Sequence, residues 1–106
     1  MILLETVIQL AGGISKNVFV LSIPDYGFTP FGKTDQEKIS SELIQYNIIN
    51  KRIALELNVS WFNITDISEK GLLEPNLVAK DGLHPSEEQY QLWVKCIYQE
   101  IKKKIN

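Results

Sequence analysis

The decisive stretch of the sequence is Val18-Phe19-Val20-Leu21, an unbroken run of β-branched and aromatic residues. Such a run is typical of a strand that is buried on both faces of a parallel sheet. The segment that follows, residues 22–32, holds two prolines and two glycines and is predicted to be a loop. Ligands of open α/β sheets bind beside the loops that leave the carboxyl ends of the strands. We therefore expect residues 22–32 to border a site.

Helical and strand patterns alternate around this predicted strand. Apolar spacing predicts a helix over residues 2–11, and residues 59–64 are rich in aromatic and β-branched side chains, which favours a second strand. Two capping boxes, Thr34-Asp35-Gln36-Glu37 and Ser86-Glu87-Glu88-Gln89, predict the starts of a helix that runs to about Asn58 and of the last helix. The order α-β-α-β-α indicates parallel strands joined by right-handed crossovers.

Each of the two long predicted helices carries one apolar face. In the helix that ends near Asn58, this face consists of Ile39, Leu43, Tyr46, Ile53 and Leu57. In the last helix, the apolar residues form a single stripe of Tyr90, Trp93, Val94, Ile97, Tyr98 and Ile101. We expect both faces to serve as packing surfaces.

Composition limits the classes of protein to which the chain can belong. Its 106 residues are 44% hydrophobic and its net charge is −2, so we expect one folded domain over residues 1–106. The slightly acidic balance gives no electrostatic case for nucleic acid. The single cysteine, Cys96, and single histidine, His84, exclude an internal disulfide and any metal site with several such ligands. The apolar start is too short to span a bilayer. It carries Glu5 and Gln9 and lacks the basic residues of a signal peptide, so a cytoplasmic location is expected.

The sequence Asp81-Gly82-Leu83-His84-Pro85-Ser86 holds the best candidates for chemistry. It places a carboxylate three residues before the only imidazole. A histidine that acts as a general base needs one ring nitrogen held by such a carboxylate, which also stabilises the imidazolium. The same spacing allows a second interpretation, in which Asp81 closes an Asx-turn on the local backbone and His84 is a solvated residue ahead of a helix.

A longer match includes these residues. The block Glu74–Ser86, followed by Tyr90 and Trp93, resembles the C-terminal signature of the SGNH (GDSL-type) hydrolases, and residues 18–27 resemble a central strand and loop of that family. The resemblance implies a partial flavodoxin-like, three-layer α/β fold with parallel strands, in which residues 1–106 are the C-terminal portion and the N-terminal half is absent. It further implies that His84 is the general base and that Asp81 orients it.

The resemblance also implies a reaction. Family members hydrolyse esters through an acyl-serine, without metal or cofactor, so the expected substrate is a lipid ester, a thioester or an acetylated sugar. Tyr26 and Phe28, in the loop of residues 22–32, are then candidates for lining an acyl or sugar-ester pocket. Asp25 in the same loop also permits a phosphoacceptor hypothesis, but the acidic pair and the lysine of a receiver-type site are not placed for it.

Other parts of the family pattern are missing from this sequence. It contains neither the G-D-S block with the nucleophile nor the two blocks that supply further oxyanion donors, and no serine has an equivalent context. The serines are Ser15, Ser22, Ser40, Ser41, Ser60, Ser68 and Ser86. We therefore expect a chain that is inactive alone, with an exposed strand edge and an uncovered apolar helix face. Such a chain would form a homo-oligomer or pair with the missing N-terminal half. The alternative is a non-catalytic α/β remnant or interaction module that acts through the exposed sheet edge.

Overall fold

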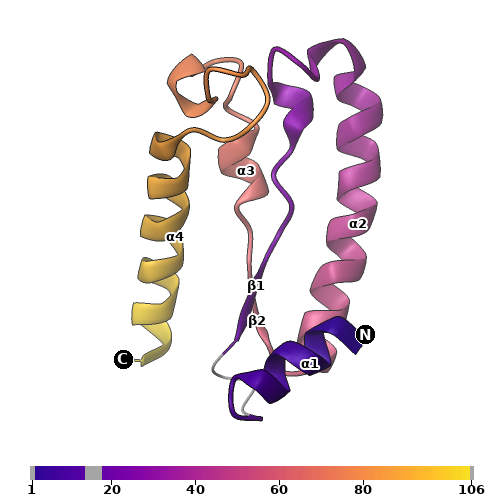
Figure 1. The fold of residues 1–106 in the computed structure, drawn as a ribbon, viewed down its shortest axis with the longest axis vertical. Coiled ribbons are helices and arrows are strands. Elements are labelled where there is room, and N and C mark those ends of the chain that lie inside the picture. Colours follow the sequence, from indigo (N-terminus) through magenta and orange to yellow (C-terminus); the bar gives the residue numbers. More distant parts are fainter. Residues whose placement is uncertain (1, 14–17, 106) are drawn as a thin grey trace.

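The structure, a computed structural model, describes residues 2–13 and 18–105 (Figure 1). The elements in chain order are α1 (Ile2–Leu10), β1 (Phe19–Leu21), the short 3₁₀ turns η2 (Tyr26–Phe28) and η3 (Lys33–Asp35), α2 (Gln36–Glu56), β2 (Ser60–Phe62), α3 (Thr65–Ser68), the 3₁₀ turn η4 (Pro75–Leu77) and α4 (Glu87–Ile105). Among these described residues, no helix is both long enough and apolar enough to cross a membrane.

The two strands pair in parallel, as the alternating pattern predicts. Phe19 lies opposite Ser60, and Leu21 lies opposite Phe62. Figure 1 shows α2 along one side of the strand pair, α4 on the other side and α1 near the end at which β1 begins. The carboxyl ends of both strands therefore point to the same end of the molecule, where η2, α3 and the start of α4 gather.

The prediction of a partial flavodoxin-like (SGNH hydrolase) three-layer fold is wrong. The described residues form one sheet of two strands with three residues each, and the rest of their regular structure is helical. Phe19 in β1 is 48% exposed, so this strand is not buried on both faces as predicted. Layered α/β folds need three or more strands to present two faces to helices. The chain is instead a small, mixed α/β protein that is mostly helical.

Most of the core lies between α2 and the strands, where the buried apolar residues are Ile39, Leu43, Ala54, Val59, Phe62 and Ile64. Leu77 is buried as well, in η4, which contacts α4. The predicted apolar face of α2 is wrong at Tyr46, which is 61% exposed. Two asparagines on α2 face the strands: Asn47 Oδ1 accepts a hydrogen bond from Ile23 N at 2.8 Å, and Asn50 Oδ1 accepts one from Trp61 Nε1 at 3.1 Å. The N–H groups of Ile23 and Trp61 that lie against α2 need hydrogen-bond acceptors, and Asn47 and Asn50 supply them. The face of α2 toward the strands is therefore only partly apolar.

The two predicted capping boxes have different outcomes. The first is wrong, because residues 33–35 form η3 and Asp35 makes no side-chain hydrogen bond to the start of α2. At the second, Ser86 Oγ accepts a hydrogen bond from Gln89 N at 3.2 Å, as an N-cap does. Gln89 does not complete the box, because its Nε2 donates instead to the buried carbonyl of Leu77 at 2.8 Å. This bond attaches α4 to η4.

The apolar stripe of α4 is largely uncovered, in agreement with the expectation of an exposed helix face. Tyr90, Val94 and Tyr98 are 46%, 66% and 62% exposed. The helix packs through its first turns against η4 and α3. Hydrophobic side chains at this spacing form a continuous exposed apolar surface, which we call the α4 stripe.

Candidate acid–base site

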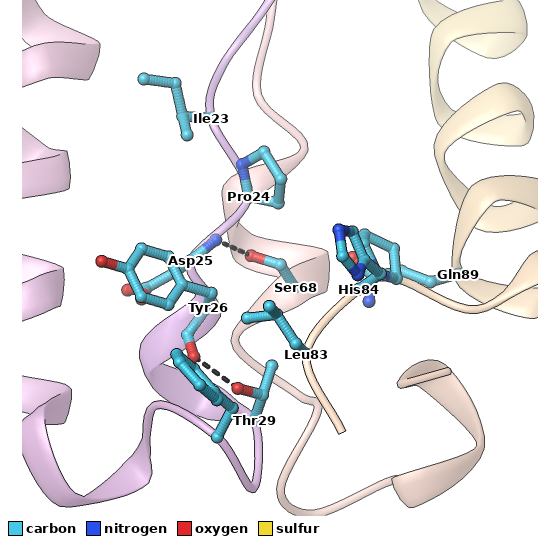
Figure 2. A pocket seen from close by; sticks show the side chains of 11 residues that line it. Ile23, Pro24, Asp25, Tyr26, Thr29, Ser68, Leu83, His84 and Gln89 are labelled. Carbon is cyan, nitrogen blue, oxygen red and sulfur yellow. Dashed lines mark hydrogen bonds between the residues drawn. The ribbon is translucent and has the colours of Figure 1, made fainter. Parts of the chain in front are cut away.

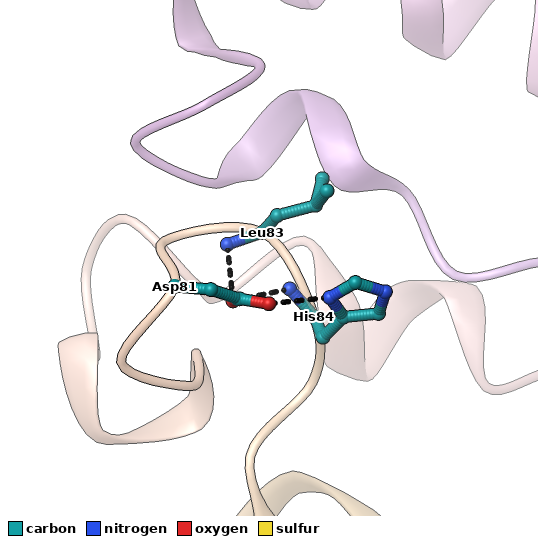
Figure 3. Close-up of polar contacts among 3 residues, drawn as sticks. All are labelled: Asp81, Leu83 and His84. Atoms are coloured by element: carbon teal, nitrogen blue, oxygen red, sulfur yellow. Dashed lines mark hydrogen bonds and ion pairs between the residues drawn. The ribbon is translucent and has the colours of Figure 1, made fainter.

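The structure brings the two predicted site residues together in one tight turn. Asp81 Oδ1 accepts hydrogen bonds from Leu83 N at 2.9 Å and from His84 N at 3.0 Å. Asp81 Oδ2 lies 2.5 Å from His84 Nδ1 (Figure 3). Gly82 has φ of 73°, a left-handed conformation that glycine adopts without strain. The Asx-turn of the second interpretation therefore forms, and the same carboxylate also contacts the imidazole, as the first interpretation requires.

These hydrogen bonds determine the charge state of the acid. The contact with the His84 ring, with help from the backbone N–H groups of Leu83 and His84, lowers the pKa of Asp81 from 3.8 to about 2. The carboxylate is ionised at neutral pH and can only accept, so His84 Nδ1 is the donor of this contact and Nε2 is the ring nitrogen left for other partners. The side chains of His84 and Asp81 are 69% and 50% exposed, so this contact adds little to stability.

Backbone hydrogen bonds fix the turn on the rest of the molecule. Ala79 N donates to His84 O at 2.8 Å, and Val78 forms an antiparallel bridge with Pro85. Phe31 N donates to Gly82 O at 3.0 Å, which joins the turn to the loop of residues 22–32. The loop that follows β1 therefore borders the candidate site, as the strand–loop pattern predicts.

An open hollow of about 400 Å³ lies between this loop and the turn (Figure 2). It is lined by Ile23, Pro24, Asp25, Tyr26, Thr29, Phe31, Ser68, Leu83, His84, Pro85 and Gln89. Tyr26 lies on its wall, where the sequence placed it, whereas Phe28 does not belong to the lining. Ser68, Leu83 and Gln89 were missed as site residues. Of these, Leu83 lies inside the D-x-x-H turn and could have been found from the sequence.

Asp25 is a structural residue of the loop. Its side chain is 2% exposed, Oδ1 accepts from Gly27 N at 2.9 Å, and Oδ2 accepts from Ser40 Oγ at 2.5 Å. A phosphoacceptor carboxylate must reach a phosphoryl donor, so this burial argues against that hypothesis. On the other side of Asp25, burial raises the pKa of the Glu69 carboxyl, and the negative charges of Asp25 and Asp66 raise it further.

The hydroxyls near the site are engaged in structural hydrogen bonds. Ser22 Oγ accepts from Ile64 N at 2.8 Å, Ser68 Oγ donates to Thr65 O at 2.5 Å, and Ser86 Oγ donates to Asn76 O at 2.7 Å. Within residues 2–13 and 18–105, the hydrogen-bond partner of the His84 ring is Asp81. Ser15 lies outside the described residues.

The arrangement can take up and release a proton at Nε2 of His84, beside a mainly apolar hollow. It does not bring a serine hydroxyl of the described residues to that nitrogen. No protein-family model, curated protein or solved structure matches this chain.

Proposed function

We propose that this chain carries the acid–base half of a serine ester hydrolase, with His84 as the general base and Asp81 as the residue that orients it. One observation carries the proposal. Asp81 Oδ2 lies 2.5 Å from His84 Nδ1, while the other oxygen of the carboxylate is held by two backbone N–H groups. An acid fixed in this way holds the ring in one orientation and one tautomer, which is its role in a Ser-His-Asp triad.

The chemistry follows from the state of the two side chains. Nε2 of His84 accepts the proton of a serine hydroxyl as its oxygen attacks the ester carbonyl, and Asp81 stabilises the imidazolium that forms. The imidazolium then returns the proton to the leaving alkoxide as the C–O bond breaks, which leaves an acyl-serine. Water, deprotonated by the same nitrogen, attacks the acyl-serine, and the acid product and the free serine result.

The attacking hydroxyl is assigned to polypeptide other than the described residues. Each serine named above at the site has its hydroxyl engaged with the backbone or with Asp25. Stabilisation of the oxyanion usually contributes more than any other effect to the rate of acyl transfer, and its donors must come with that hydroxyl. The 69% exposure of His84 leaves its ring accessible to such a partner.

The test is to read the genomic DNA on both sides of this coding segment for G-D-S and G-x-N-D motifs and to express whatever reading frame carries them together with this chain. We expect that protein to hydrolyse p-nitrophenyl acetate and to be blocked by a fluorophosphonate. His84→Ala should lower kcat by about 10³-fold or more. Flanking DNA without such motifs, or turnover that survives His84→Ala, would contradict the proposal.

A second candidate is a non-catalytic interaction module. It is favoured by the α4 stripe, whose residues Val94 and Tyr98 are 66% and 62% exposed, more than by the sheet edge. This candidate predicts a stable complex whose formation is unaffected by His84→Ala and which hydrolyses no ester. The assay above therefore separates the two candidates.

A further inference from the structure

We propose that the hollow beside His84 is a binding site for an uncharged, predominantly apolar group of a small ligand, and that it rejects a ligand with a charged end. The identification of this group as the acyl or alkyl part of an ester rests on the proposed function. The binding itself rests on the lining of the hollow alone.

The polar side chains of the lining have almost no hydrogen-bonding capacity left for a ligand. Thr29 Oγ1 donates to Tyr26 O at 2.6 Å and accepts from Gly32 N at 3.1 Å. Ser68 Oγ accepts from Asp25 N at 2.7 Å in addition to its bond to the backbone of α3 (Figure 2).

Gln89 is engaged in the same way. It is 3% exposed, its Nε2 donates to Leu77 O at 2.8 Å, and its Oε1 accepts from Trp93 Nε1 at 3.1 Å. The hydroxyl of Tyr26 lies on the side of the loop away from His84 in Figure 2. Nε2 of His84 is therefore the polar side-chain atom of the lining that can offer a ligand one hydrogen bond.

The remaining walls are hydrocarbon. They are formed by Ile23, Pro24, Phe31, Leu83 and Pro85. A hollow of about 400 Å³ falls within the range of ~300–1,000 Å³ that is usual for small-molecule sites. Phe31 is 67% exposed, so a ligand that covers its ring removes apolar surface from water, which drives binding.

Charge disfavours ligands with an ionised end. A carboxylate in the hollow would lose water, would find the hydrogen-bond donors of Thr29, Ser68 and Gln89 already used, and would lie near the acidic side chain of Asp25. An ammonium group would be attracted to the negative charge of Asp25, but that side chain is 2% exposed and its oxygens already accept hydrogen bonds from Gly27 and Ser40, which hinders a direct ion pair. Either charged end would therefore lose water without a close partner to replace it.

Leu83 connects this site to the acid–base pair. Its backbone N–H donates to Asp81 Oδ1 at 2.9 Å, so the carboxylate that contacts His84 also holds the backbone from which the Leu83 side chain reaches the wall of the hollow. Leu83 is therefore assigned as a residue that determines ligand specificity.

The experiment titrates the ¹⁵N-labelled chain with three amides that differ only at one end: N-hexylacetamide, 6-acetamidohexanoate and N-(5-aminopentyl)acetamide. We expect the first to shift the amide resonances of Thr29, Leu83 and His84, and the two charged probes to bind at least about tenfold more weakly, because each would bury an unpaired charge. Equal affinities, tighter binding of the carboxylate through a protonated His84, or the absence of any shift at these amides would each overturn the proposal.

Matched variants locate the site. Leu83→Glu should abolish the binding of N-hexylacetamide, whereas Leu73→Glu should leave it unchanged, because Leu73 is 86% exposed and lies outside the hollow. Phe31→Ala, at a side chain that is 67% exposed, should weaken binding several-fold through the lost apolar contact. If Leu83→Glu and Phe31→Ala leave the affinity for N-hexylacetamide unchanged, the ligand binds elsewhere, and the assignment of the hollow as its site is refuted.

The outcome is independent of the proposed hydrolase function, because the amide probes are not turned over. Binding of N-hexylacetamide without ester hydrolysis in the assay of flanking polypeptide would leave this inference intact and reject the hydrolase. Hydrolysis that is as fast for esters with a charged acyl end as for uncharged ones would keep the hydrolase and reject this inference.

Discussion

The substitution Ser22→Ala tests the link between β1 and the segment that carries Ser68. Ser22 is 3% exposed, and its hydroxyl oxygen accepts hydrogen bonds from Ile64 N at 2.8 Å and from Thr65 N at 3.1 Å, while Thr65 Oγ1 lies 2.7 Å away. These contacts join residues that are more than forty positions apart in the chain. The hydroxyl is thus a structural acceptor and is not available as a nucleophile.

The expected loss of stability follows from which donors keep a partner. In the alanine variant, Thr65 N still donates to Asn63 Oδ1 at 2.9 Å, and Thr65 Oγ1 still donates to Ile23 O at 2.6 Å. Ile64 is 0% exposed, and its N–H loses its acceptor. Because an unsatisfied buried donor costs about 1–3 kcal/mol, we expect the free energy of unfolding to fall by about 2 kcal/mol.

Urea unfolding followed by circular dichroism measures this loss. With a urea m-value of ~1–3 kcal/mol/M, a loss of about 2 kcal/mol lowers the midpoint by roughly 1–2 M. The control is Ser41→Ala, at an exposed position on α2, which should change the free energy of unfolding by less than about 0.5 kcal/mol. If Ser22→Ala is no more destabilising than this control, Ser22 does not accept the Ile64 N–H and the argument for its structural role fails.

Three further predictions concern the acid–base pair and the exposed surface. The carboxyl resonance of Asp81 should titrate with a midpoint near pH 2, and this midpoint should move toward pH 3.8 in His84→Ala. Because the pKa of Asp81 is lower in the folded chain than in the unfolded chain, its contribution to stability is complete above pH 3.8 and is lost as the pH falls toward 2. An unchanged midpoint in the variant would refute the ring contact. Sedimentation velocity should show self-association that increases with concentration. Tyr98→Lys should weaken it, because Tyr98 belongs to the α4 stripe, whereas the control Tyr46→Lys, at an exposed residue of α2, should not. A chain that stays monomeric at all concentrations would contradict this prediction. The chain alone should cleave p-nitrophenyl acetate no faster than free imidazole, and turnover that a fluorophosphonate blocks would show that it contains its own nucleophile.

Several features were predictable because they depend on neighbours in the sequence. Within the predicted run of residues 18–21, Phe19–Leu21 form a strand. Ser86 caps the last helix, and Asp81 meets His84 because one turn holds both residues. The stripe on α4 is also a local property, since the repeat of the helix alone aligns Tyr90, Val94 and Tyr98. Their exposure agrees with the expectation that a helix face remains uncovered.

The three-layer architecture was wrongly predicted, and the surroundings of the site were not predicted at all, because both depend on contacts between distant parts of the chain. Nothing local in the sequence shows that Ser68 Oγ accepts from Asp25 N, 43 positions away, or that Asn47 replaces an apolar residue on the face of α2 that meets Ile23. The sequence pattern indicates which residues favour burial. Which of them are actually buried depends on the number of strands in the sheet and on the side chains that cover those strands. The sequence by itself thus determined the three longer helices, the parallel strands and the Asp81–His84 turn. Only the tertiary structure decided the short helix α3, the two-stranded sheet and the apolar hollow in front of His84.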